Sequence, residues 1–192
     1  PKTTSIISVT MNEKERKLYV AYLQKAREAL GADIGKISFL AALGKLREIC
    51  VDASSFFEGF DDESSKLSLA LNLIQESIEN GHKVLVFSFF SSVLPKIKNK
   101  LKNEYNITSK IIDGSTKSND RVSLANDFNS PSGVKVMLVS LKAGGTGLNL
   151  IGADTVVHLD PWWNFSAEEQ ATDRAYRIGQ TKPVTVYKLV CH

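Results

Sequence analysis

The chain has 192 residues, of which 43% are hydrophobic and 23% charged; this is the balance of an ordinary globular protein and excludes a disordered or collagen-like chain. No apolar run approaches the roughly 18–20 residues that a membrane-spanning helix needs, so we expect no membrane partner. The two cysteines are too few for a disulfide framework, which favours an intracellular, reducing environment, and the net charge of +3 does not by itself indicate nucleic-acid binding.

Residues 1–60 are predicted to form a helical subdomain that follows a short strand at residues 6–9. Thr10 and Glu13 have the spacing of a capping box, in which each side chain bonds the backbone N–H of the other residue, so a helix is expected to begin there. Apolar side chains then recur at helical spacing, and Gly31 is suited to end this helix.

A second apolar stripe with helical spacing runs from Phe39 to Cys50 and predicts a second helix. Residues 52–65 are rich in Ser, Asp and Gly, which is typical of a boundary between domains. Three phenylalanines in this stretch indicate that it packs against the protein and is not a free linker. We therefore expect the helical subdomain to end at residue 60 and a second domain to cover residues 61–192.

In the second domain the predicted elements alternate between helix and strand. Helical spacing of apolar residues predicts helices at 67–78, 93–101, 122–128 and 167–178. Short apolar runs predict strands at 83–87, 110–113, 134–140, 155–160 and 184–190. This alternation predicts an α/β fold with a parallel sheet that helices cover on both faces.

In open parallel sheets, ligands bind beyond the carboxyl ends of the strands, and this sequence places many of its glycine, hydroxyl and lysine residues there. The loops after the first four of these strands contain SFFS, GST, LKAGGTGLN and PWWN. Together their hydroxyls and backbone N–H groups would form an anion-binding surface. The other interpretation is that each loop is only a turn between a strand and a helix.

The glycine-rich segment at 144–147, GGTG, does not match either of the two common nucleotide-binding motifs. A Walker A loop ends in Gly-Lys-Ser/Thr, which the sequence does not contain, and the GxGxxG spacing is also missing. The acidic residues 61–63 follow no apolar strand, so they are interpreted as a solvated surface and not as a Walker B motif. The spacing of His and Cys is not that of a metal site, so we expect no metal held by protein ligands alone.

The segment 166–180, SAEEQATDRAYRIGQ, has the most informative pattern. Ser166 and Glu169 form a candidate capping box, and Gly179 suits the end of the predicted helix. Small and apolar residues recur at i, i+4 and i+7 and predict the face that packs on the sheet, namely Ala171, Ala175 and Ile178.

A polar stripe lies one position earlier on the same predicted helix, on Gln170, Arg174 and Arg177. Two arginines in register on a rigid helix can each grip phosphate oxygens with a planar fork of donors. The alternative is a solvated face in which Asp173 pairs with Arg177. Trp162 and Trp163 carry the same ambiguity, because an indole at a loop edge can stack on a base, brace the arginine helix or simply pack.

Four segments, in this order, resemble the C-terminal RecA-like lobe of the SWI/SNF-type chromatin-remodelling ATPases of helicase superfamily two. They are KLSLALNLIQESIENGHKVLVFSFFSSVL, then IIDGST followed by Arg121 and DFN, then VMLVSLKAGGTGLNLIGADTVVHLDPWWN, and finally QATDRAYRIGQTKPVTVYKLV. The RIGQ ending is more specific than a general helicase signature. Residues 1–60 resemble the helical protrusion that decorates this lobe.

The resemblance implies an ATP-driven motor that translocates along double-stranded DNA. In that family the first lobe carries the Walker motifs and holds most of the ATP and its Mg²⁺, so this chain would be the second lobe and inactive alone. Its partners would be duplex DNA, the first lobe of the same protein and proteins bound to the DNA. Its location would be the cytoplasm or nucleoid of a prokaryote, or the nucleus of a eukaryote.

Carried over residue by residue, the resemblance makes Arg174 and Arg177 the arginine fingers, with Gln170 helping to hold the cleft between the lobes. The nucleotide side of the lobe would be formed by Gly145, Gly147 and Asn149. The DNA phosphates would be contacted by Ser88, Gly114, Ser115, Lys142 and Thr146, with Trp162 or Trp163 near the DNA.

Two other functions stay open from the sequence. One is a non-catalytic DNA- or protein-binding module on the same scaffold, because a fold alone does not establish an activity. The other is a lobe of an RNA helicase, which the RIGQ ending disfavours.

Overall fold

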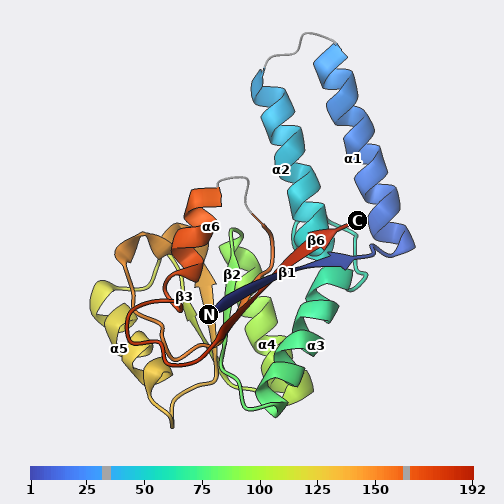
Figure 1. The fold of residues 1–192 in the computed structure, drawn as a ribbon. Helices are drawn as coiled ribbons and strands as arrows, with labels where there is room; N and C mark the ends of the chain where they lie inside the picture. Colours follow the sequence, from blue (N-terminus) through green and yellow to red (C-terminus); the bar gives the residue numbers. More distant parts are fainter. Residues whose placement is uncertain (32–35, 162–164) are drawn as a thin grey trace.

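The chain is described from a computed structural model that covers residues 1–31, 36–161 and 165–192. Within these residues six parallel strands form one sheet in the order β1-β6-β5-β2-β4-β3 (Figure 1). The strands are β1 (Lys2–Val9), β2 (Val84–Ser88), β3 (Ser109–Ile112), β4 (Val136–Ser140), β5 (Thr155–His158) and β6 (Val184–Cys191). The helices are α1 (Glu13–Gly31), α2 (Lys36–Asp52), α3 (Ser65–Glu79), α4 (Leu94–Tyr105), α5 (Ser118–Asn129) and α6 (Phe165–Thr172), and a 3₁₀ helix spans Leu141–Thr146.

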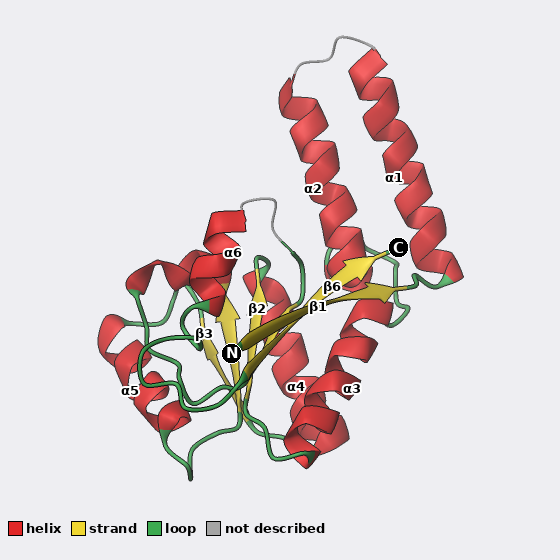
Figure 2. Ribbon diagram, in the orientation of Figure 1, coloured by secondary structure: helices red, strands yellow, loops and turns green. Residues whose placement is uncertain are grey.

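The central strands β2, β4 and β5 are buried on both faces, as their short apolar sequences predict. Val84 and Val86 of β2 point into one core with α3 and α4, whereas Leu85 and Phe87 point into a second core with α5 and α6. Figure 2 shows the two helix pairs on opposite sides of the strands. The predicted α/β architecture is therefore confirmed, and its parallel strands bring all their carboxyl ends to one edge.

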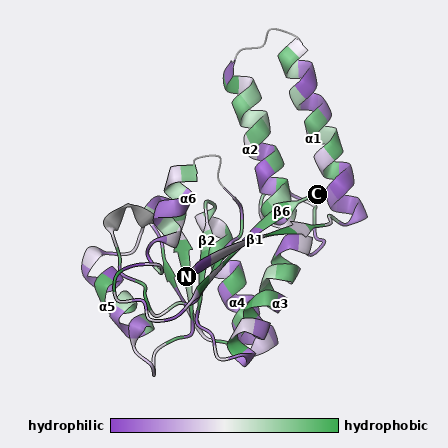
Figure 3. Cartoon of the chain, in the orientation of Figure 1, coloured by the Kyte–Doolittle hydropathy of each residue, from purple (hydrophilic) through white to green (hydrophobic). Residues whose placement is uncertain are grey.

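Helices α1 and α2 form a hairpin that projects away from the sheet (Figure 1). The predicted capping box is shifted by two residues, because Asn12 and not Thr10 precedes the helix: Glu15 N–H donates to Asn12 Oδ1 at 2.8 Å, and Asn12 N–H donates to Glu15 Oε2 at 3.0 Å. Helix α1 ends at Gly31, as predicted. Figure 3 shows apolar and polar residues interspersed along both helices of the hairpin.

Strand β1 begins earlier than the predicted strand at 6–9 and belongs to the sheet. It pairs in parallel with β6 from Lys2 opposite Val184 to Val9 opposite Cys191. The residues before the helical hairpin are thus an edge strand of the α/β sheet, while the division of the chain at residue 60 stays a prediction. Phe56 packs against the α3–α4 core and meets Phe90 edge to face, so the stretch after α2 is packed, as its phenylalanines indicate.

The last helix is shorter than predicted. It begins at Phe165 and ends at Thr172, so Ser166 lies inside it and Glu169 pairs with Lys2 at 2.8 Å instead of capping the helix. Ala171 and Ala175 are buried as predicted, but Ile178 is fully exposed.

The early end of α6 has a physical reason in the loop that follows β4. The backbone carbonyl of Arg174 accepts from Leu150 N–H at 3.0 Å, and the carbonyl of Ala175 accepts from the Gln180 side chain at 3.0 Å. Directly after Thr172, Arg174 N–H donates to the carbonyl of Ala171 at 3.2 Å and Ala175 N–H to that of Thr172 at 3.0 Å, which are contacts three and not four residues back. The chain thus passes from α6 into tighter turns that the loop after β4 holds in place. No helix within the described residues is long and apolar enough to cross a bilayer.

Candidate functional site

The loops after β2, β3, β4 and β5 meet at the carboxyl edge of the sheet, and this edge holds most of the predicted site residues. Gly114 and Ser115 follow β3 and are exposed, and Lys142 follows β4 and is also exposed. Thr146 and Gly145 lie in the 3₁₀ helix Leu141–Thr146. Trp162 lies outside the described residues.

Arg121 of α5 ties the loops after β3 and β4 together. Its Nε donates to the carbonyl of Thr116 at 2.8 Å, its Nη2 to the carbonyl of Asp113 at 3.1 Å, and its Nη1 to the carbonyl of Ala143 at 3.1 Å. A guanidinium suits this position because it presents several donors in a fixed plane. Arg121 thus sets the spacing of two loops that carry predicted DNA contacts.

The carboxylate of Asp113 accepts hydrogen bonds from donors in the loop after β3. The backbone N–H and the hydroxyl of Ser115 both donate to Asp113 Oδ1, at 2.9 Å and 2.6 Å. The Ser115 hydroxyl is the main reason that the pKa of Asp113 lies below its usual value. A phosphate that uses the Ser115 donors must therefore displace this carboxylate.

Ser88 lies at the end of β2 and is completely buried. Its Oγ accepts from Phe90 N–H at 3.0 Å, so in this arrangement the hydroxyl shapes the turn after β2 and lies beneath the surface. A direct contact of Ser88 with a DNA phosphate needs this turn to open, and it stays a prediction.

Asp160, which follows β5, is buried beside this turn. Its Oδ2 accepts from Phe89 N–H at 3.0 Å, whereas Oδ1 has no hydrogen-bond partner among the described residues. Burial raises the pKa of Asp160 to about 6, although the Ser88 hydroxyl, Phe89 N–H, Lys66 and Arg47 oppose the rise.

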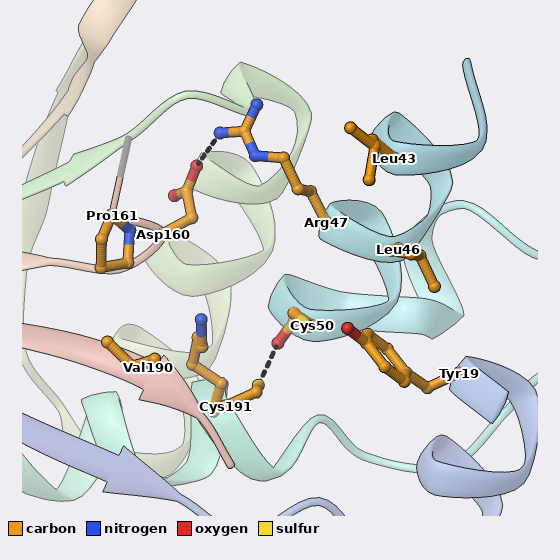
Figure 4. Close-up of a pocket in the computed structure, with 10 residues that line it drawn as sticks. Tyr19, Leu43, Leu46, Arg47, Cys50, Asp160, Pro161, Val190 and Cys191 are labelled. Atoms are coloured by element: carbon orange, nitrogen blue, oxygen red, sulfur yellow. Dashed lines mark hydrogen bonds and ion pairs between the residues drawn. The ribbon is translucent and has the colours of Figure 1, made fainter. Parts of the chain in front are cut away.

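Two cations face the Phe89 ring at this edge. Lys142 Nζ lies 4.6 Å from the ring centroid, and the guanidinium carbon of Arg47 lies 4.8 Å from it. Arg47 comes from α2 and its Nη2 is 3.9 Å from Asp160 Oδ2, as Figure 4 shows. The foot of the helical hairpin is therefore in contact with the loops that carry the predicted DNA contacts.

Arg174 and Arg177 lie in the turn after α6 and not in register on a helix, so the predicted stripe with Gln170 does not form. Gln170 is exposed within α6. Arg174 is only 6% exposed, and its Nε and Nη1 have no hydrogen-bond partner among the described residues. Burial and then the charge of Arg177 lower the pKa of Arg174.

Arg177 points to the glycine loop. It is exposed, and its Nη1 donates to the carbonyl of Gly147 at 3.0 Å. Gly147 has φ +61°, a conformation that residues with a Cβ rarely adopt. Arg177 and Asn149 also line one surface hollow of about 350 Å³, together with Ile178. The structure therefore brings three predicted nucleotide-side residues together, namely Gly147, Asn149 and Arg177.

The Gln180 side chain fixes the turn that carries both arginines. Its amide nitrogen donates to the carbonyls of Ile151, Ala153 and Ala175 at 2.7 to 3.0 Å. Gln180 is the last letter of the RIGQ ending, so its role here is to lock the arginine turn against the loop after β4.

Comparisons with known proteins decide the family. The model of the helicase conserved C-terminal domain matches residues 65–179, which is more than half of the chain. The chain belongs to the helicase C-terminal domain family. Its relatives include SWI/SNF-type chromatin-remodelling ATPases, which confirms the resemblance read from the sequence.

Two curated relatives illustrate this membership. The helicase C-terminal domain described here is 38% identical over 191 residues to an uncharacterized ATP-dependent helicase of Mycoplasma genitalium, with 98% of the chain and 18% of the relative covered. It is 35% identical over 207 residues to the ISWI chromatin-remodeling complex ATPase of Saccharomyces cerevisiae, with 99% of the chain and 18% of the relative covered. The chain thus spans about a fifth of these relatives.

A solved structure confirms the RecA-like fold with its N-terminal helices. The SWI2/SNF2 ATPase core of Sulfolobus solfataricus in complex with double-stranded DNA has a TM-score of 0.84 and 28% identity, with 99% of this chain and 41% of that chain covered. The likeness extends through the helical hairpin as well as the sheet.

The helicase C-terminal domain has side chains that suit the phosphate groups of a nucleotide. Two nitrogens of buried Arg174 have no partner within the described part of the chain and, with exposed Arg177 nearby, suit the oxygens of a phosphate. Among the described residues, however, no group of three or more His, Cys, Asp or Glu side chains is placed to hold a metal ion.

Three residues that hold parts of this domain together could not be predicted from the sequence, namely Arg121, Arg47 and Gln180. Arg121 is indicated only as part of a motif, and no pattern indicates the roles of Arg47 and Gln180. Each acts over 20 or more positions of sequence, through Ala143, Asp160 and Ile151 respectively. Spacing along one element carries no signal for such contacts.

Proposed function

We propose that this chain is the second motor lobe of an ATP-dependent translocase that moves along double-stranded DNA. The observation that carries the proposal is Arg174, a buried guanidinium of which two nitrogens have no hydrogen-bond partner among the described residues, in a turn that also presents Arg177 beside Gly147. Burying a guanidinium without partners is costly, so the site favours an anion that arrives from outside the chain.

In this proposal Arg174 and Arg177 are arginine fingers that neutralise charge on the transferring phosphoryl group. Bound ATP with Mg²⁺ supplies that group, and a first lobe holds most of both. Gly147 and Asn149 line the approach to the arginines, Gly145 lies in the same loop, and Gln170 faces the cleft from α6. Gln180 positions the arginine turn without touching the nucleotide.

The proposed DNA contacts lie on the carboxyl edge of the sheet. Gly114, Ser115, Lys142 and Thr146 belong to loops that are adjacent because β3 pairs with β4. Contacts of this kind recognise phosphates and not bases, which suits a motor that tracks any sequence. A protein with this role works inside the cell, and proteins bound to the DNA are further partners that we propose for it.

The fingers are tested by Arg174→Ala and Arg177→Ala in a protein that contains both lobes. We expect ATP binding to be retained and hydrolysis to fall by roughly 10³–10⁵-fold. Arg27→Ala, an exposed position on α1, is the matched control and should leave hydrolysis unchanged. Hydrolysis within threefold of the control in both variants would remove the finger assignment.

The 192-residue chain alone is expected to show no ATP turnover above background, because its sequence holds no Gly-Lys-Ser/Thr loop to cradle phosphates. A steady-state phosphate-release assay checks this, and substantial turnover would contradict it. Stimulation of the two-lobe protein by duplex DNA, compared with duplex RNA, distinguishes a DNA motor from an RNA helicase.

A further inference from the structure

A pocket of about 320 Å³ lies where the foot of α2 meets the ends of β5 and β6 (Figure 4). Its walls are mainly apolar, and none of its lining residues belongs to the proposed nucleotide or DNA contacts. They are Tyr19, Leu43, Leu46, Arg47, Cys50, Lys66, Asp160, Pro161, Val190 and Cys191.

The pocket is lined by a lysine, Lys66, whose ammonium group has no partner among the described residues. Lys66, in the first turn of α3, is 3% exposed, and no described residue forms a hydrogen bond or ion pair with it. Its positive charge acts on Asp160 and on Cys191 only through space. An ammonium group has three N–H donors and no acceptor, so oxygen acceptors of a molecule bound in the pocket would pair with it.

The pocket also contains both cysteines of the chain. The Cys191 thiol donates to the carbonyl of Cys50 at 3.3 Å, which links the last strand to the end of α2 (Figure 4). The two residues are 141 positions apart and are both free thiols of intermediate exposure. A pocket with an apolar wall, a buried cation and a thiol has the groups that bind and react with a small polarised electrophile.

We propose that this pocket is a modification site, in which Cys191 is alkylated by α,β-unsaturated carbonyl compounds whose carbonyl oxygen accepts a hydrogen bond from Lys66. The Cys191 sulfur, as thiolate, forms a bond to the β-carbon, and the carbon–carbon π electrons move to the carbonyl oxygen as an enolate. The enolate then takes up one proton, equal to the proton that the thiol released, so no oxidant or reductant is needed.

The charges around Cys191 support this direction. The neighbouring Cys50 thiol and then the ammonium of Lys66 lower the pKa of Cys191 to about 7, against burial and the charge of Glu15. The Cys191 thiol and burial raise the pKa of Cys50. Ionisation of Cys191 ends its donation to the Cys50 carbonyl, which opposes the lowering. Besides Cys50, the hairpin brings Tyr19 of α1 and Arg47 of α2 to the pocket. Burial raises the pKa of Tyr19, so its hydroxyl is neutral near pH 7, and burial lowers the pKa of Arg47.

The test is alkylation of the 192-residue chain with N-ethylmaleimide at pH 7, followed by intact mass and peptide mapping. We expect one fast adduct on Cys191, formed at least about fivefold faster than on the urea-unfolded chain, because the thiolate is the reacting form. Cys50→Ser leaves a single thiol and a hydroxyl donor, and should keep the fast reaction. Cys191→Ser should lose it.

Lys66→Met removes the ammonium but keeps the apolar stem, and should slow the adduct by about fivefold or more. Lys102→Met, at an exposed position on α4, is the matched control. A rate for Lys66→Met equal to that of the control, or an adduct that forms first on Cys50, would overturn the proposal. Where Lys66→Met does not fold, the wild-type pH profile decides: a midpoint near pH 7 supports the site, and a midpoint near the ordinary thiol value of about 8.5 contradicts it.

Discussion

Asp160 shows how a single side chain joins the parts of this domain. It receives Phe89 N–H from the turn after β2 and lies 3.9 Å from Arg47 of the helical hairpin. The same carboxylate is almost completely buried, and one of its oxygens has no partner in the part of the chain that the structure describes. Its contacts position the turn after β2, whereas its burial destabilises the ionised carboxylate. Only the second effect depends on pH, so a pH series distinguishes the two.

We expect Asp160→Asn to become more stabilising, relative to the wild type, as pH rises. The pKa of Asp160 is raised to about 6 in the folded chain, so its contribution to stability is complete below the unfolded value and is lost as pH rises through 6. Asparagine keeps an oxygen for Phe89 N–H and does not ionise. The difference in free energy of unfolding should change by about 1–3 kcal/mol between pH 4 and pH 8.

Urea unfolding at several pH values measures this difference. Asp61→Asn, at an exposed position, is the control and should show little change with pH. A difference between Asp160→Asn and the wild type that is constant from pH 4 to pH 8 would mean that Asp160 does not carry the raised pKa.

At this scale, residue chemistry could be predicted only in part from the sequence. Arg177 and Gly147 were expected on the nucleotide side and are joined by a hydrogen bond, but nothing in the spacing indicated that Arg174 is buried. Burial depends on how the turn after α6 packs on a distant loop. The burial of Ser88 could not be predicted for the same reason, since a hydroxyl at a strand end is equally suited to the surface and to the turn beneath it.

At the scale of elements, apolar periodicity was sufficient for the sheet and for most helices. Strands β2 and β4 are short apolar runs that helices bury on both sides, and α3 and α4 have apolar stripes that match their cores. The end of α6 could not be predicted, because the tighter turns that follow it are held by donors from Leu150 and Gln180, which bind the carbonyls of Arg174 and Ala175. The spacing of apolar residues along one helix gives no information about contacts with a distant loop.

Arg121 offers a test of how two loops are held together. Arg121→Met removes donors to three backbone carbonyls, those of Asp113, Thr116 and Ala143. We expect a loss of about 1–3 kcal/mol in the free energy of unfolding, because partly buried carbonyls lose their partners. We also expect weaker binding to duplex DNA, because the loops that carry Ser115 and Lys142 lose their fixed spacing.

Arg121→Lys separates positioning from direct phosphate contact. A lysine keeps the charge but cannot serve three carbonyls in one plane, so it should bind duplex DNA as weakly as Arg121→Met. Fluorescence anisotropy with a labelled duplex measures the affinity. Full recovery of binding in Arg121→Lys would show that charge alone matters at this position.

At the scale of the whole molecule, the helical hairpin and the sheet are joined by buried polar groups at the foot of the hairpin. Glu15 accepts from the backbone and the hydroxyl of Ser65 at the start of α3, both at 2.8 Å, and completely buried Asp52 pairs with Lys96 of α4 at 2.6 Å. These contacts, together with Arg47, connect the hairpin to the carboxyl edge. Motion of the protein loops that carry the proposed DNA contacts should therefore be coupled to motion of the helical hairpin.

The charge of the chain provides the last test, because a net charge of +3 says nothing about where the cations lie. If the carboxyl edge contacts DNA phosphates, binding of the 192-residue chain to a duplex should weaken with salt, with a slope of log K against log salt of about −2 to −4 for a few phosphates. Lys142→Ala should reduce that slope by about 1, since one phosphate contact is lost. Lys102→Ala should not, because Lys102 is in the last turn of α4, which runs back toward the amino edge of the sheet. Affinity that is the same at 50 and 200 mM salt would contradict phosphate contacts. Equal effects of the two lysine variants would mean that the carboxyl edge does not bind the DNA.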